Sequence, residues 1–192
     1  MFKMKRRLIL AFIVFMSGKV FAQQKTTAHT WQFHSVNNIG LLEGQVGSAF
    51  QIQSINGMQY QSWYAGIGLG LDFYRYRTIP LFIDVRKEFG SSVNKFFAYA
   101  DGGVHFPWLT DNEKMTYLSD GHFNTGFYTD LGMGYKIALG RTNHLLLSVG
   151  YSLKKLEETM EYYYYFPPIN AVDKEHVNYS LNRLTLKVGW EF

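Results

Sequence analysis

Runs in which apolar and polar residues alternate constrain this chain more than any other feature. In segment 63–74, Trp63, Ala65, Ile67, Leu69, Leu71 and Phe73 have one parity, and tyrosine, glycine and aspartate have the other. A period of two indicates a β-strand whose faces meet different surroundings. A run of about ten residues can cross a bilayer as a tilted strand. The pattern predicts strands with one face toward lipid and the other toward a polar interior.

Seven segments show this pattern, and single-chain bacterial barrels have an even number of strands, so we expect an eighth. The seven are 42–53, 63–74, 81–86, 96–106, 127–139, 145–154 and 183–192. The eighth is assigned to 30–36, with a turn at Asn37 and Asn38. In 42–53, Leu42 is expected to face outward and Glu43 inward. The predicted fold class is all-β, a closed antiparallel up-and-down transmembrane barrel of eight strands.

The first 22 residues have the pattern of a secretory signal peptide. Basic residues that include Lys3, Arg6 and Arg7 precede an apolar run too short to span a membrane, and a small-residue site ends at Ala22. We expect cleavage there, leaving 23–192 as one barrel domain. The chain has no cysteine, which excludes disulfides and an anchor on a lipidated cysteine.

The net positive charge of the whole chain does not indicate nucleic-acid binding. The chain has 19 Lys and Arg against 15 Asp and Glu, and segment 1–22 carries Lys3, Lys5, Arg6, Arg7 and Lys19 but no acid. Without that segment the charge is close to zero. A basic surface, the electrostatic feature of nucleic-acid binding, is therefore not expected.

The predicted inward faces carry charges of both signs in nearly equal number. They are Glu43, Asp72, Asp84, Arg86, Asp101, Asp130, Lys136, Lys154, Arg183, Lys187 and Glu191. Buried charges are tolerated when they are paired and hydrogen-bonded. We therefore predict an ion-paired network that plugs the lumen, with a narrow ion channel as an alternative. Inward glycines at Gly66, Gly68 and Gly70 would leave room for bulky neighbours.

The connections between the predicted strands alternate between long and short. If the C-terminus is periplasmic, the long segments 107–122 and 157–177 are extracellular, as in bacterial barrels. The second contains a run of aromatics before two prolines: Tyr162, Tyr163, Tyr164, Tyr165 and Phe166. This run is a candidate surface-binding site. The alternative is that the flanking strands extend above the bilayer and the tyrosines join an interfacial aromatic girdle.

The C-terminal segment LNRLTLKVGWEF resembles the last strand of small eight-stranded outer-membrane barrels of the OmpA/OmpX type, a porin-like barrel domain. The resemblance implies the outer membrane of a Gram-negative cell and contact with its lipid. It also implies that Val188, Trp190 and Phe192 form a signal for the barrel-assembly machinery. An extracellular or neighbouring outer-membrane partner is a further expectation. The resemblance implies no activity.

A lipid-modifying enzyme is the main alternative to a structural or surface-interaction role. Some outer-membrane barrels modify lipid A with histidine and serine near the outer leaflet, and His105, His122 and Ser119 are the candidates here. No motif supports a nucleophile with an oriented base, so no catalytic residue is assigned. His34, His105 and His122 are all expected near the extracellular mouth. Their spacing matches no metal site, and neither a metal nor a cofactor is predicted.

Overall fold

The computed structural model describes residues 30–108, 115–116, 119–166 and 169–192, with side chains left out at 115–123 and 160–175. The signal peptide predicted at 1–22 lies outside the described residues, so its cleavage stays a prediction. Residues Trp31–Phe192 form a unit of their own. No helix among the described residues is long and apolar enough to cross a membrane.

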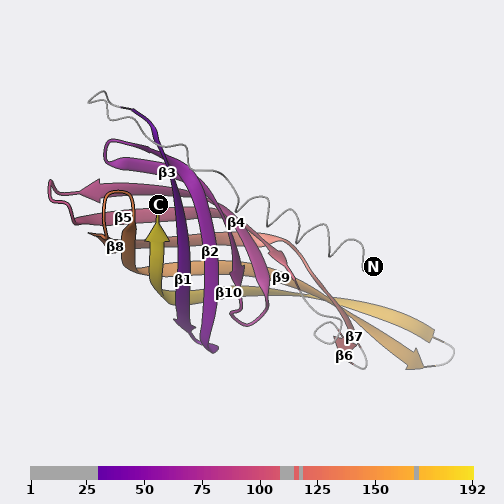
Figure 1. Ribbon diagram of the computed structural model, residues 1–192. Coiled ribbons are helices and arrows are strands. Elements are labelled where there is room, and N and C mark those ends of the chain that lie inside the picture. Colours follow the sequence, from indigo (N-terminus) through magenta and orange to yellow (C-terminus); the bar gives the residue numbers. More distant parts are fainter. Residues whose placement is uncertain (1–29, 109–114, 117–118, 167–168) are drawn as a thin grey trace, which may run out of the picture. The chain divides into compact units, whose positions relative to one another are not determined.

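Eight long strands form the wall of a closed barrel (Figure 1). They are β1 (Gln32–Gly44), β2 (Gly47–Tyr60), β3 (Trp63–Asp72), β4 (Thr78–Phe89), β5 (Lys95–Pro107), β8 (Gly126–Ala138), β9 (His144–Phe166) and β10 (Ile169–Glu191). The short strands β6 (Met115–Thr116) and β7 (Ser119–Phe123) lie between β5 and β8 in sequence. Each wall strand pairs antiparallel with the next along the chain. The predicted eight-stranded up-and-down barrel is confirmed.

Antiparallel pairing of β1 with β10 closes the barrel. The paired residues run from Val36 with Glu191 to Gly44 with Arg183. Ser35 and Phe192 extend this contact, because each backbone amide donates to the other's carbonyl, at 2.9 and 3.0 Å. Closure removes the open sheet edges, which would leave backbone groups without partners in lipid.

Two ends of the barrel can be distinguished by their connections. The terminal rim carries the two chain ends of this unit and the turns 61–62, 90–94 and 139–143. The loop rim carries the connections 45–46 and 73–77, the end of β5 and the start of β8.

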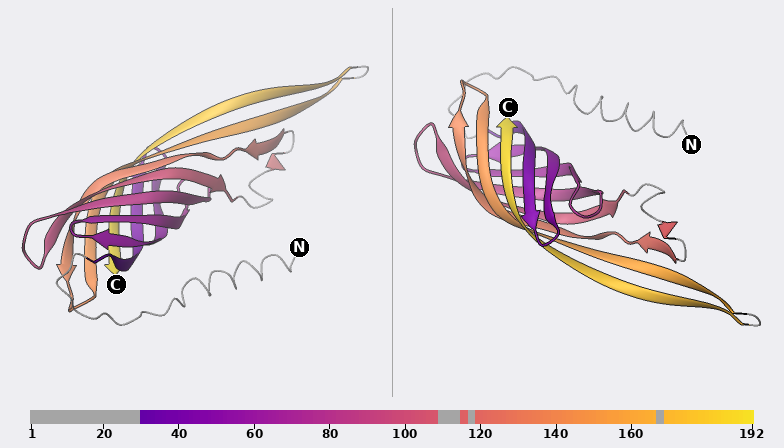
Figure 2. Two further views of the ribbon diagram at one scale, coloured as in Figure 1. Left: turned by 90° about the horizontal axis from the view of Figure 1, so that it is seen from above. Right: turned by 90° about the horizontal axis from the view of Figure 1, so that it is seen from below.

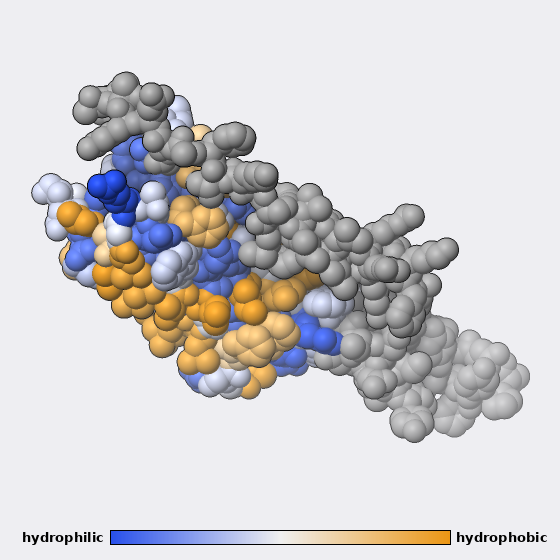
Figure 3. All heavy atoms as spheres, in the orientation of Figure 1, coloured by the Kyte–Doolittle hydropathy of each residue, from blue (hydrophilic) through white to orange (hydrophobic). Residues whose placement is uncertain are grey.

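The exterior of the wall is apolar between two sets of aromatic residues. Trp63, Phe89, Phe96 and Trp190 are exposed near the terminal rim, and Phe50 and Phe106 near the loop rim. Exposed aliphatic residues lie between them: Ile39, Ile52, Ile67, Leu69, Leu81, Ile83, Val85, Leu131, Met133, Leu147, Val149, Leu184, Leu186 and Val188. Figure 3 shows hydrophobic residues over much of one face. An apolar band between aromatic girdles is the exterior of a membrane-spanning barrel.

The predicted boundaries of the first two strands, 30–36 and 42–53, were wrong. Strand β1 runs through Asn37 and Asn38 without a turn, and the turn lies instead at Gln45 and Val46. Asn38 points inward, where its amide donates to the Gln53 Oε1 at 3.4 Å, so packing across the barrel overrides its turn propensity. Gly47 follows the turn with φ of 109°, which glycine adopts readily.

This change of strand boundaries also reverses the predicted faces at the end of β1. Leu42 is fully buried inside the barrel, whereas Glu43 is exposed and accepts a hydrogen bond from the Ser48 hydroxyl. Because β1 continues to Gly44, Leu42 lies on the inward face with Asn38. Ile52 lies on the outward face. The prediction that Glu43 belongs to the lumen network is therefore corrected.

Strands β9 and β10 continue well past the wall as a two-stranded hairpin (Figures 1 and 2). Their mutual pairing reaches Phe166 and Ile169, whereas β8 leaves β9 at Lys154. Beyond that point β7 pairs with residues 158–162 of β9. The predicted loop 157–177 is thus mostly strand, as in the alternative of strands that extend past the wall. The aromatic run from Tyr162 to Phe166 lies in β9, and its side chains are outside the described set.

Candidate functional site: an ion-paired lumen

The alternation of each strand carries charged side chains into the lumen. Ten of the eleven residues predicted for the lumen network are buried there, and Glu43 is the exception. They are Asp72, Asp84, Arg86, Asp101, Asp130, Lys136, Lys154, Arg183, Lys187 and Glu191. Each is at most 7% exposed. The contacts divide them into a loop-side, a central and a terminal cluster.

The loop-side cluster consists of Asp72, Ser152, Lys154 and Arg183, which lie where β3, β9 and β10 approach the loop rim. The Arg183 guanidinium pairs with Asp72 through Nη1, and its Nη2 donates to the Ser152 hydroxyl at 2.7 Å. The Lys154 ammonium is 3.6 Å from the same carboxylate. Arg183 and Lys154 are both fully buried. One carboxylate therefore links two cations from the opposite wall.

The connection 73–77 attaches to this cluster. The Lys154 ammonium donates to the carbonyls of Tyr74 and Tyr76, at 3.2 and 3.1 Å. The Val46 amide donates to the Tyr74 hydroxyl at 2.8 Å, so the tyrosine also reaches the β1–β2 turn. Arg75 has a φ of 61°, and its guanidinium lies 4.3 Å from the centre of the Tyr179 ring on β10. The connection between β3 and β4 thus contacts β9, β10 and the β1–β2 turn across the mouth.

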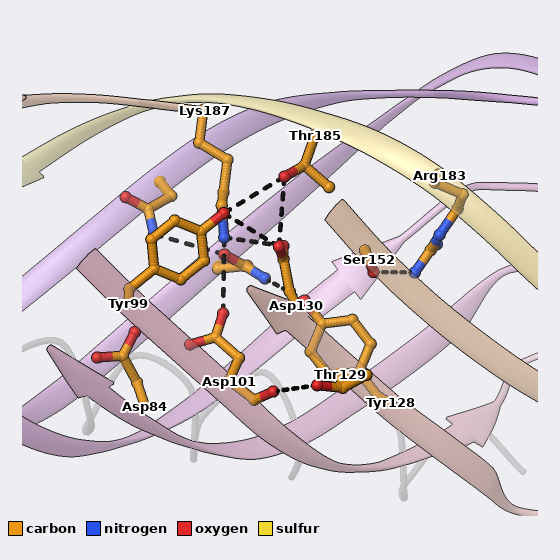
Figure 4. Close-up of polar contacts among 12 residues, drawn as sticks. Asp84, Tyr99, Asp101, Tyr128, Thr129, Asp130, Ser152, Arg183, Thr185 and Lys187 are labelled. Carbon is orange, nitrogen blue, oxygen red and sulfur yellow. Dashed lines mark hydrogen bonds and ion pairs between the residues drawn. The ribbon is translucent and has the colours of Figure 1, made fainter. Parts of the chain in front are cut away.

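The central cluster is formed by Asp84, Arg86, Tyr99, Asp101, Asp130, Thr185 and Lys187, of which Figure 4 labels all but Arg86. Three aspartates stand side by side, since Asp101 of β5 pairs with Asp84 of β4 and with Asp130 of β8. The Lys187 ammonium lies 3.0 Å from Asp130 and 3.5 Å from Asp101. Two cations therefore offset most of the charge of three aspartates.

Further bonds hold the central carboxylates in place. Arg86 binds Asp84 in a bidentate arrangement, with its Nε and Nη2 2.8 and 2.9 Å from the two oxygens. The Tyr99 hydroxyl donates to Asp130 at 3.0 Å. The Lys187 ammonium lies 4.2 Å from the Tyr99 ring centre, a cation–π contact.

The terminal cluster consists of His34, Glu88, Lys95, Lys136, His144 and Glu191. The Lys136 ammonium lies 2.8 Å from Glu88 and 2.5 Å from Glu191. Lys95 reaches Glu88 at 2.7 Å from the rim, where it is about one-third exposed (32%). Sequence reasoning missed Glu88, although it has the parity of Asp84 and Arg86. The predicted strand ended two residues too early.

Aromatic side chains fill the space between the clusters. Tyr64, Phe82, Phe97, Tyr99 and Tyr128 are buried together with three aliphatic residues. Gly68 illustrates the tight fit, because a Cβ added there would lie 2.3 Å from the Phe82 ring. A cavity beside the terminal cluster has about 10 Å³, room for about one water molecule. Buried aromatic rings therefore occupy much of the space between the clusters.

The three histidines are not gathered at one mouth. His34 lies at the terminal rim, where its Nδ1 is 3.3 Å from Glu191, because β1 begins there. His105 is buried near the loop rim, and its Nε2 lies 2.6 Å from the Lys155 carbonyl. His122 and Ser119 lie on β7, with side chains outside the described set. Among the described residues, no three His, Asp or Glu side chains are placed to hold a metal ion.

The loop-side cluster leads to a stability prediction. Replacing Arg183 by leucine leaves Asp72 with Lys154 alone, and breaking a buried pair costs about 3–5 kcal/mol of unfolding free energy. The matched control is Lys95→Leu, which removes a partly exposed partner and should cost about 0–1 kcal/mol. Urea unfolding in lipid vesicles measures both. Equal losses would show that Arg183 is not the partner of a buried carboxylate.

Comparison with known proteins gives a match in fold only. No family model and no curated protein matches this chain. Neisserial surface protein A is similar in structure, with a TM-score of 0.51, 13% identity, and coverage of 84% of this chain and 95% of that one. The outer membrane protein AlkL gives a TM-score of 0.50 at 10% identity, covering 91% and 95%. The chain therefore has the fold of these small outer-membrane β-barrels, with an apolar exterior.

Proposed function

We propose that this protein is a structural or surface-interaction barrel of the outer membrane whose lumen is closed to ions. The observation that carries the proposal is the loop-side cluster with the connection 73–77. Asp72, Lys154 and Arg183 join opposite walls, and the backbone of Tyr74 and Tyr76 is bound across the mouth. Two more levels of paired charges lie behind it.

The two alternative functions have less support. A narrow channel needs a continuous aqueous path, whereas the central charges contact one another across a lumen packed with aromatic rings. A lipid-modifying enzyme needs a base that faces the outer leaflet. The His105 imidazole points into the barrel and its Nε2 is occupied by the Lys155 carbonyl. An enzyme built on His105 is therefore disfavoured.

The proposed surface for interaction is the hairpin of β9 and β10. Bacterial barrels place their longer connections outside the cell, so the loop rim and the hairpin would be extracellular. One structural neighbour is called a surface protein. During assembly, the exposed C-terminal residues Val188, Trp190 and Phe192 would be recognised by the barrel-assembly machinery.

Closure of the lumen can be tested by thiol labelling, because the chain has no native cysteine. Ser152→Cys places a thiol in the loop-side cluster, where the native side chain is fully buried. Ser48→Cys places a matched thiol at the exposed loop rim. We expect a charged, water-soluble reagent to label position 48 rapidly and position 152 slowly. Similar rates, together with steady wild-type conductance in planar bilayers, would support the channel instead.

The orientation of the barrel can be tested with an epitope tag. A tag inserted between β9 and β10 should bind antibody on intact cells, since the hairpin would face the outside. The same tag between Arg141 and Thr142, in a turn of the terminal rim, should bind only after permeabilisation. Labelling of intact cells at the second position alone would mean that the barrel is inserted with the opposite orientation.

A further inference from the structure

Two histidines flank one carboxylate at the terminal rim, where the seam between β1 and β10 ends. The Nδ1 atoms of His34 on β1 and His144 on β9 lie 3.3 and 3.8 Å from Oε1 of Glu191 on β10. His144 is also the register partner of Glu191. The two histidine side chains are only 12% and 18% exposed, so a charge on either ring would be largely removed from water.

The same groups stand next to the last hydrogen bonds of the seam. Ser35, which follows His34, and Phe192, which follows Glu191, exchange backbone hydrogen bonds of 2.9 and 3.0 Å. From Val36 onward the paired residues of the seam continue away from the rim. A change of charge around Glu191 therefore acts at the end of the contact that closes the barrel.

The charges of the terminal cluster balance while its histidines are neutral. Lys136 pairs with both Glu88 and Glu191, and Lys95 pairs with Glu88. Two cations thus meet two carboxylates, and protonation of both histidines would add two positive charges. The other described residues that line this space include no carboxylate: they are Gln59, Tyr64, Arg86, Phe97 and Leu146.

Little space is available to compensate for the added charge. The cavity beside the cluster has about 10 Å³, room for about one water molecule. The Nδ1 atoms of His34 and His144 make no hydrogen bond to a described residue. The oxygen that both approach, Glu191 Oε1, already binds the Lys136 ammonium. An imidazolium at either position would compete with Lys136 for one carboxylate.

We propose that the terminal end of the β1–β10 seam is a pH-sensitive switch, closed while His34 and His144 are neutral and loosened when both are protonated. Protonation would place three cations around Glu191. Their mutual repulsion would act between β1, β8 and β9, which carry His34, Lys136 and His144.

The direction of the pH dependence follows from the burial of the two rings, which lie at the rim, outside the membrane-spanning segments. Burial lowers the pKa of His34 and of His144 below the ordinary value of 6.5, and the smaller effects of Glu191 and Lys136 oppose each other. The unfolded chain therefore binds these protons more readily than the folded chain. The stabilisation is present above about pH 6.5 and is lost as the pH falls through that value.

This switch is separate from the proposed closure of the lumen. The loop-side cluster and the connection 73–77 lie at the other end of the barrel and contain no histidine. Acid that loosens the terminal rim would therefore leave the loop rim closed to ions. Either proposal can fail without the other.

Hydrogen exchange of purified protein in phospholipid vesicles tests the switch. The reporters are the amides of Ser35 and Phe192, and the internal control is the middle of the same seam, around Gly40 and Lys187. After correction for the intrinsic effect of pH on exchange, protection of the reporters should fall between about pH 7.5 and about pH 5.5, while that of the control stays unchanged. Constant protection of the reporters would overturn the proposal. Equal losses at the reporters and the control would do so too, because they would indicate global unfolding.

Matched variants assign the loss of protection to the two rings. His34→Gln and His144→Gln together leave polar side chains that do not titrate, so the reporters should stay protected in acid. Each single variant should show part of this effect, and heat-modifiable gel mobility at neutral pH verifies folding. His105→Gln, near the loop rim, is the control and should leave the acid-induced loss unchanged. A loss as large as that of the wild type in the folded histidine variants would contradict the proposal, because another group would then be responsible.

Discussion

The antiparallel pairing of β1 with β10 is the contact on which the rest of the structure depends. A membrane core offers no water to backbone amides and carbonyls, so an open sheet edge is not tolerated there. Pairing from Val36 with Glu191 to Gly44 with Arg183 removes that edge. Closure in turn creates an interior, and the period of the strands sends every second side chain into it. The charged residues of the lumen follow from this geometry.

Inside the barrel, each charge pair is strong because its groups are buried away from water. Arg183 and Lys154 have no exposed surface, so Asp72 must compensate both where water does not screen them. Lys187 shows the reverse arrangement, in which one cation compensates two carboxylates, Asp130 and Asp101. These networks support the proposal that the lumen is closed to ions. For this reason we propose that interaction involves the β9–β10 hairpin rather than the lumen.

Sequence alternation predicted most of the wall and ten lumen charges, because lipid outside and polar groups inside impose opposite demands on alternate residues. The prediction failed where a polar residue lies on the outward face. Asn37 faces outward in the apolar band, so Asn37 and Asn38 resembled a turn, and the faces of Leu42 and Glu43 were exchanged. The extension of β9 and β10 past the wall was foreseen only as an alternative for the aromatic run, because alternation alone does not reveal a pairing between two strands. The contact between Lys154 and the 73–77 connection involves backbone carbonyls, which no side-chain pattern reveals.

The most direct test of the account is whether the cost of a charge on the exterior depends on depth. Leu147 is exposed on β9 within the apolar band, and Leu139 is exposed in the turn at the terminal rim. Folding into vesicles should show that Leu147→Arg costs about 2–4 kcal/mol of unfolding free energy, against about 0–1 kcal/mol for Leu139→Arg. A barrel that spans the bilayer with this face toward hydrocarbon predicts that difference. Equal costs at the two positions would contradict it.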